Sequence, residues 1–344
     1  ALEWYQQAAD LRRAIGDESG LATSLTYAAN VERDLGHLVQ ARSLFEESLP
    51  VFLSLGDANG AVENLYGTAA LYEAMGRSGD ALRLYTEGIE LCSQTPDCNW
   101  GPLLLVERAG VERLTGLTHE SLTSLDRAEA MLATIDDPST EARVWQVRAL
   151  ASMDLGDSIA ARDRMVRSLQ LARDSGNLRL EFDGHTLLSA LYVDMGVFDR
   201  ARTSAQDALE LAKRVDDPSF ERGAYFALAR VDLAEGRAEE AEANYASALV
   251  LDEAAGRPEL MYADLIGRGG ARSLAGRSRE AREDLHRALA LSHEIDWERE
   301  RWVAYMNLAD SFEESHPDSA AFYYEATLTS LERASRQFGG EALN

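Results

Sequence analysis

The side chains that could take part in catalysis or metal binding are six histidines, two cysteines and many carboxylates. Their spacing in the sequence decides which of these roles is possible. The histidines are scattered, and the sequence contains no HExxH metal motif, no G-x-S-x-G nucleophile motif and no P-loop. In an acidic helical chain most carboxylates form solvated helix faces. We therefore expect no catalytic residue, cofactor or metal within the 344 residues, and place any enzymatic activity in a domain outside them.

The two cysteines flank the short stretch SQTPD, so their state depends on how tightly the chain turns there. Cys92 and Cys98 are close enough in sequence to be bridged if the turn is tight. We expect free thiols, with a disulfide and a metal site as the alternatives. Two cysteines can form at most one disulfide, which cannot stabilise a chain of this length by itself. The fold must therefore be stabilised by the packing of its secondary-structure elements.

A forty-residue repeat supplies those elements. Its turn glycine recurs without insertions at Gly36, Gly76, Gly116, Gly156, Gly196, Gly236 and Gly276. A small residue follows five positions later, at Ala41, Ala81, Ser121, Ala161, Ala201, Ala241 and Ala281. A second small residue stands twelve positions before each of these, at Ala29, Ala69, Ala109, Ala149, Ser189, Ala229 and Gly269.

Each repeat reads as two amphipathic helices, because apolar residues recur at three- and four-residue spacing on both sides of the glycine. The glycine supplies the positive φ that ends many helices. Further breaks, such as Gly56-Asp57 and Asp217-Pro218, end one helix and cap the next. Small residues let two helix axes approach closely where they cross. Pro50 falls inside a helical stretch, where we expect a kink.

The fold class predicted from this pattern is all-α, an α-solenoid of antiparallel helix pairs. Residues 1–16 match the second helix of a truncated repeat, residues 17–336 form eight helix pairs, and residues 337–344 form a tail or the start of a linker to a following domain. His185 occupies a column otherwise filled by leucine and aromatic residues, so we expect it to pack in the core rather than bind a ligand or sense pH.

Ala69 and Ala81, with Tyr72 and Tyr85 between and after them, follow a known family pattern, as do Ser189, Tyr192 and Ala201. The chain thereby resembles the tetratricopeptide repeat, in the forty-residue form of kinesin light chains, bacterial Rap-type regulators and sensor domains of signalling ATPases. Glu112 and Ser152 depart from the pattern, which leaves the boundaries of their repeats uncertain. The resemblance implies a right-handed superhelix whose concave groove holds a peptide or a partner helix.

The resemblance places the groove on the first helix of each pair. Our candidate groove residues are Tyr66, Val106, Arg143, Phe226, Arg230, Leu233, Ile266 and Leu274. The apolar members predict a hydrophobic groove for an amphipathic helix or an extended segment, and the arginines, with Arg113, could anchor an acidic ligand. The alternative is that some of them pack between helices. The groove has too few cations for the clamp that grips a chaperone's carboxyl terminus.

The C-terminal segment carries a second resemblance. A tyrosine-rich helix runs into a Leu-Glu-Arg step and then a Glu- and Leu-containing stretch, through Tyr323, Tyr324, Glu325, Leu331, Glu332, Arg333, Glu341 and Leu343. This pattern is similar to the last repeat before a CHAT domain, a caspase-like protease family. The resemblance implies a protease domain downstream, with its His and Cys outside this chain.

The charge and hydropathy of the chain exclude some classes of binding partner. The chain carries 34 basic and 59 acidic residues, a formal charge of -25, which disfavours nucleic acid and anionic membrane surfaces. It has no apolar run of 18 residues, so we expect no membrane span and a cytoplasmic location.

Two functional hypotheses follow. The first is an interaction and sensor module that binds a protein or peptide in its groove and controls an attached bacterial CHAT-type protease, which could itself be a partner of the groove. The alternative is a freestanding scaffold, or the helical sensor of a signalling or transcriptional ATPase.

Overall fold

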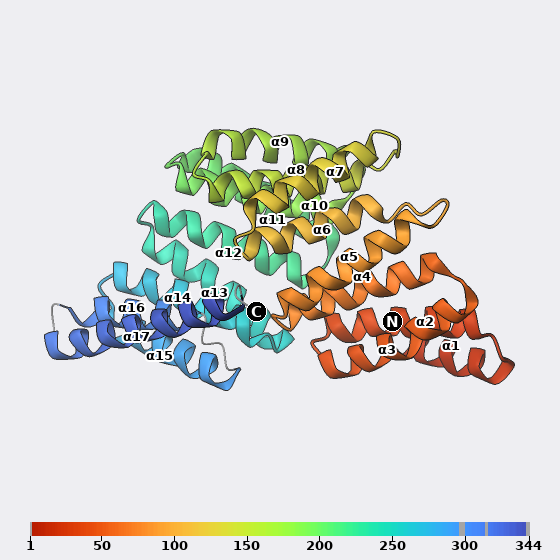
Figure 1. Ribbon diagram of the computed structural model, residues 1–344. Helices are drawn as coiled ribbons and strands as arrows, with labels where there is room; N and C mark the ends of the chain where they lie inside the picture. Colours follow the sequence, from red (N-terminus) through yellow and green to blue (C-terminus); the bar gives the residue numbers. More distant parts are fainter. Residues whose placement is uncertain (1, 296–299, 314–315, 342–344) are drawn as a thin grey trace. The chain divides into compact units, whose positions relative to one another are not determined.

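The computed structural model describes residues 2–295, 300–313 and 316–341, and the side chains of these residues up to position 333 (Figure 1). All the elements in these ranges are helices, so the predicted all-α class is confirmed. The chain divides into two compact units, Ala1–Ser175 and Gly176–Asn344. We call them unit 1 and unit 2 and describe each by itself.

Unit 1 begins with a single helix, α1 (Leu2–Ile15), and continues as four helix pairs. Their bounds are α2 (Glu18–Asp34) with α3 (Leu38–Leu55), α4 (Ala58–Ala74) with α5 (Ser78–Ser93), α6 (Gly101–Leu114) with α7 (Thr118–Leu132), and α8 (Pro138–Asp154) with α9 (Ser158–Asp174). The helices of each pair pack on one another, and each second helix also packs on the next first helix.

Unit 2 repeats the arrangement with four more pairs. Their bounds are α10 (Leu178–Asp194) with α11 (Phe198–Val215), α12 (Pro218–Ala234) with α13 (Ala238–Ala255), α14 (Pro258–Leu274) with α15 (Ser278–Glu294), and α16 (Arg301–Phe312) with α17 (Pro317–Glu341). Of the predicted tail, residues 337–341 belong to α17, and residues 342–344 lie outside the described part.

The turns form as the repeated residues predict. All seven repeat glycines have a positive φ between 70° and 82°, which a residue with a Cβ rarely adopts. At the breaks between pairs an acidic or amide side chain accepts a backbone N–H from the first turn of the next helix, with donor–acceptor distances of 2.8 to 3.1 Å. These caps are Asp17, Asp57, Asp137, Asn177 and Asp217.

The two columns of small residues meet where the helices of a pair cross. The Ser121 hydroxyl donates a 2.8 Å hydrogen bond to the Ala109 carbonyl, joining one column directly to the other. A Cβ added to Gly269 would lie 3.4 Å from the Ala281 carbonyl oxygen. Twelve alanines of the two columns have no exposed surface: Ala29, Ala41, Ala69, Ala81, Ala109, Ala149, Ala161, Ala201, Ala229, Ala241, Ala281 and Ala309. Close backbone approach therefore sets the geometry of every pair.

Two single-residue expectations concern His185 and Pro50. His185 is buried, with its Nδ1 atom 3.5 Å from the Asp207 carboxylate, so its predicted core position is confirmed. Helix α3 continues through Pro50 without ending there, and the kink stays a prediction. Among the residues that the structure places, no helix combines the length and apolar character needed to cross a lipid bilayer.

The expectation of free thiols is wrong, because Cys92 and Cys98 form a disulfide. Helix α5 ends at Ser93, and the chain then turns back through Asp97, which has a φ of 63°. This turn brings the two cysteine Cα atoms to 5.4 Å, within bridging range. The disulfide thus attaches the linker 94–100 to the C-terminal end of α5.

We predict that Ala241→Leu destabilises the fold by about 1 to 3 kcal/mol, because the crossing of α12 and α13 has no space for a larger side chain. Ala243→Leu, on the exposed side of α13, is the matched control and should leave stability nearly unchanged. Urea unfolding followed by circular dichroism measures both. Equal stability of the two variants would contradict the close crossing.

We predict that reducing the disulfide lowers the free energy of unfolding by about 2 kcal/mol, the loss expected when a loop this short is no longer closed. Thermal unfolding with and without dithiothreitol measures the change, and hydrogen exchange should rise in residues 94–100. The double variant Cys92→Ser, Cys98→Ser is the control and should not respond to reductant. A wild-type protein that is equally indifferent to reductant would refute the bridge.

Candidate functional site

We call the surface that the first helices of the pairs form within each unit its first-helix face. In unit 1, α2 lies against α4 and α6 lies against α8. In unit 2, α10 lies against α12, α12 against α14, and α14 against α16. The predicted candidate residues all belong to these first helices, three in unit 1 and five in unit 2.

The three unit 1 candidates have different environments. Tyr66 is partly exposed, and its ring centroid lies 5.6 Å from that of Trp100 and 6.4 Å from that of Tyr85. Arg143 is also partly exposed and is ion-paired with Glu107. Val106 has no exposed surface and packs in the core of unit 1, so its assignment to a groove is corrected. Its short side chain ends between the helices, whereas the longer Tyr66, which also stands three residues before the small residue of its helix, reaches the surface.

The first-helix face of unit 1 also holds partly buried titratable groups that the sequence analysis missed. Burial raises the pKa of Glu73 to about 7, although a hydrogen bond donated by the Tyr85 hydroxyl opposes the rise. Burial also raises the pKa of Glu107, against the opposing effect of Arg143. Glu73 lies seven residues after Tyr66, two turns along the same helix face. A search seven residues beyond each candidate groove residue would therefore have found it.

In unit 2 a hollow of about 160 Å³ opens between α10 and α12. Thr186, Ala190 and Val193 line it from α10, and Phe226 and Arg230 line it from α12. Thr186 and Phe226 stand three residues before the small residue of their helix, and Ala190 and Arg230 stand one residue after it, so these four occupy two repeated positions. Val193 lies one turn beyond Ala190. The structure therefore brings the predicted candidates Phe226 and Arg230 together at one site.

Phe226 is held firmly at this hollow. Its ring makes an edge-on contact with Tyr245, with 5.6 Å between centroids, and the Arg222 guanidinium lies 4.8 Å from its centroid. Arg222 is fixed in turn by Asp252 at 2.7 Å and Asp264 at 3.0 Å. The hollow thus has a rigid aromatic side.

Arg230 supplies the polar part of the hollow. Within the described ranges, no carboxylate lies within ion-pair distance of its guanidinium, and no protein acceptor within hydrogen-bond distance. The neighbouring arginines are all paired: Arg222 with Asp252 and Asp264, Arg237 with Asp232, and both Arg268 and Arg272 with Asp284. Arg230 is therefore a cation available to a ligand.

The remaining unit 2 candidates lie outside the hollow. Leu233 is partly buried and lies 3.8 Å from where a Cβ on Gly270 would stand. Ile266 packs against the core that contains Leu265. Leu274 is 52% exposed at the end of α14. Of the apolar candidates in unit 2, only Phe226 therefore lines the hollow itself.

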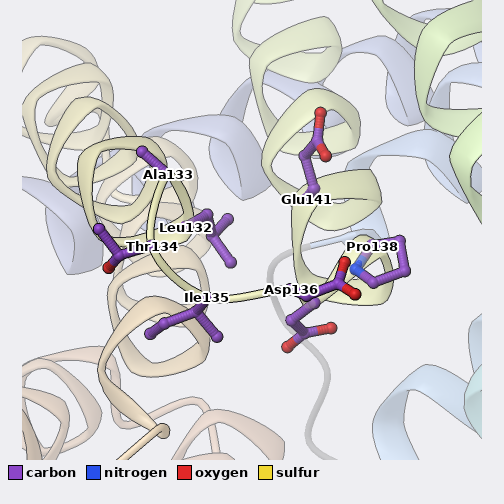
Figure 2. Close-up of a pocket in the computed structure, with 8 residues that line it drawn as sticks. Leu132, Ala133, Thr134, Ile135, Asp136, Pro138 and Glu141 are labelled. Carbon is purple, nitrogen blue, oxygen red and sulfur yellow. The ribbon is translucent and has the colours of Figure 1, made fainter.

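A second hollow, of about 400 Å³, lies at the turn between α7 and α8 (Figure 2). Two of its carboxylates already have partners in the protein. Asp137 accepts the Thr140 backbone N–H at 3.0 Å, and Glu141 lies 3.5 Å from Arg167. Its third carboxylate, Asp136, is exposed to solvent on an open capping turn, so the hollow beside Arg230 is the better candidate site.

The fold defined by these helix pairs is that of tetratricopeptide repeat proteins. Residues 21–94, from α2 to the end of α5, match the tetratricopeptide repeat family. Comparison of the sequence with curated proteins gives no match. Solved structures extend the likeness to nearly the whole chain.

Three similar structures define the fold comparison. A STAND signal-transduction ATPase with a tetratricopeptide repeat sensor, from Pyrococcus horikoshii, is 13% identical, with a TM-score of 0.66 over 98% of this chain. The chain spans only 55% of that protein's length. The apo quorum sensor NprR from B. thuringiensis is 16% identical, with a TM-score of 0.66 over 96% of this chain and 97% of its own.

The third is the Rap conjugation gene regulator of plasmid pLS20, in complex with the Phr peptide. It is 13% identical, with a TM-score of 0.65 over 97% of this chain and 93% of its own. At these identities the comparisons establish the fold alone.

We predict that Glu73→Gln stabilises unit 1 above pH 7 by about 1 to 3 kcal/mol. Because the folded-state pKa is raised from 4.5 to about 7, the stability from the protonated carboxyl is fully present below pH 4.5 and is lost as the pH rises through 7. The glutamine stays neutral and can still accept the Tyr85 hydroxyl.

Urea unfolding from pH 4 to 9 measures this difference, with exposed Glu90→Gln on α5 as the control. We expect the advantage of Glu73→Gln over wild type to grow between pH 4.5 and 7. A constant difference across that range would mean that Glu73 titrates as an ordinary carboxyl.

Proposed function

We propose that this chain is a non-catalytic interaction and sensor module that binds a peptide or a peptide-like segment of a partner protein on its first-helix face. The observation that carries the proposal is the hollow between α10 and α12, where a rigid aromatic ring and an available cation lie side by side. A concave apolar site with one convergent polar group is typical of ligand sites. Rap with the Phr peptide supplies an analogy on the same fold.

Peptide binding accounts for this site better than catalysis does. The groups lining the hollow are aliphatic, aromatic, hydroxyl and guanidinium, and it contains no base beside a nucleophile. A guanidinium binds and orients an acidic group but does not transfer protons at neutral pH. The site is thus suited to recognition.

A finer form of the proposal names what the module controls. The pattern at residues 320–343 supports a CHAT-type protease as the attached effector, although residues 342–344 lie outside the described part. The similarity to the Pyrococcus horikoshii STAND protein supports the alternative, a sensor attached to an ATPase. The intact mass and peptide map of the native protein distinguish them: a downstream domain with a His/Cys pair supports the first, and an upstream P-loop supports the second.

We predict that peptides selected by the chain from a phage-displayed random heptapeptide library bind through Phe226. Phe226→Ser should weaken the selected peptides about tenfold, measured by fluorescence anisotropy, because it removes the aromatic side of the hollow. Val250→Ser, at an exposed position on α13, is the control and should leave affinity unchanged.

Thermal unfolding of both variants completes the test. Unchanged peptide affinity combined with a lower melting temperature for Phe226→Ser would show that Phe226 serves only the core, and would contradict the proposed site. Failure to select any peptide above the background of bare beads would contradict peptide binding altogether.

A further inference from the structure

The chemistry of the unit 2 face restricts the peptides it can bind. Its first helices are mostly apolar, and Arg230 is a cation of that face with no carboxylate partner in the described ranges. Both units carry ion pairs on their first helices, such as Glu107–Arg143 in unit 1 and Arg222–Asp264 in unit 2. Arg230 differs from these paired residues because a hollow lies beside it, so an apolar ligand group and a ligand carboxylate can bind side by side there.

Gly270 on α14 adds an independent observation. Glycine in a helix interior costs about 1 kcal/mol relative to alanine, so its presence usually serves packing. Gly267 and Gly269 on the same helix do serve packing, since an added Cβ would lie 2.2 Å from the Tyr245 ring and 3.1 Å from Leu285. A Cβ on Gly270 would meet only Leu233, at the ordinary contact distance of 3.8 Å. Packing therefore does not require this glycine.

Gly270 occupies the same repeat position as Arg230 and Ala190, on three neighbouring first helices. Ala190 and Gly270 have no side chain that projects far from its helix, so the backbones of α10 and α14 are accessible on both sides of Arg230. A ligand main chain could then lie close to the helices, with one of its side chains in the hollow beside Phe226. The hollow, of about 160 Å³, has room for one aliphatic side chain.

We propose that unit 2 recognises an extended peptide segment in which an apolar side chain lies next to a carboxylate. The apolar side chain fills the hollow between α10 and α12, the carboxylate pairs with Arg230, and the main chain crosses Ala190 and Gly270. This inference rests on the proposed peptide-binding function and specifies its ligand. The chain's formal charge of -25 repels a polyacidic partner, so the segment carries one carboxylate at this position and is not an acidic run.

The test uses the whole chain and heptapeptides selected from the phage library, synthesised with a fluorescein label. We expect the selected sequences to be enriched in Asp or Glu adjacent to Leu, Ile, Val, Met or Phe. Arg230→Gln should weaken such a peptide at least tenfold, and so should replacing the peptide's carboxylate with its amide. The two changes together should cost little more than either alone, because they remove the same ion pair.

Two matched controls separate the ion pair from general charge and folding effects. Arg214→Gln removes the same charge from an exposed position on α11 and should leave affinity unchanged. Gly270→Leu should block the peptide while keeping or raising the melting temperature, because leucine favours the helix over glycine and a Cβ here meets only Leu233, at 3.8 Å. Gly110→Leu makes the same change in the corresponding column of unit 1, where an added Cβ also meets nothing within 4 Å, and should leave binding intact.

The outcomes are distinguishable. Selected peptides that bind wild type, Arg230→Gln and Gly270→Leu equally well would overturn this inference while leaving the peptide-binding function standing. Selected peptides without the apolar–acidic pair would overturn it as well. No enrichment over bare beads would remove the proposed function and this inference together.

Discussion

The structure depends on the close approach of two helix backbones at one crossing in every pair. The hydrogen bond from the Ser121 side chain to the Ala109 carbonyl spans that crossing and leaves no space for a longer side chain. Because the contact involves backbone atoms, it fixes the distance between the helices of a pair more narrowly than interlocking larger side chains would. A repeat that keeps this contact can vary almost everywhere else.

Within each unit the regular crossings place the first helices on one side of their pairs, and the residues on these helices differ between the two units. In unit 1 the face carries Tyr66, the ion pair Glu107–Arg143 and Glu73, whose carboxylate accepts a hydrogen bond from the Tyr85 hydroxyl. In unit 2 Phe226 stands at the repeat position of Tyr66 and lies beside Arg230. The Arg143 charge is paired within the protein, whereas Arg230 has no carboxylate partner among the described residues and is available to a ligand.

The sequence predicted the features that follow from backbone geometry. The repeat glycines and the small-residue columns depend only on φ and on helix separation, which residue type reports directly. It predicted the site less well, because exposure depends on how far a side chain extends past its neighbours. Val106 and Tyr66 share a column, yet only Tyr66 reaches the surface. The Cys92–Cys98 disulfide depends on a turn through Asp97. No sequence motif predicted the positive φ of this residue.

The central claim is that a ligand lies on the first-helix face of unit 2, and a crystal structure of the whole chain with a selected peptide tests it most directly. The account predicts an extended peptide across α10, α12 and α14, with an apolar side chain against Phe226 and a carboxylate oxygen within hydrogen-bond distance of the Arg230 guanidinium. A peptide bound on the second helices, or on the face of unit 1, with Arg230 still without a carboxylate, would contradict it.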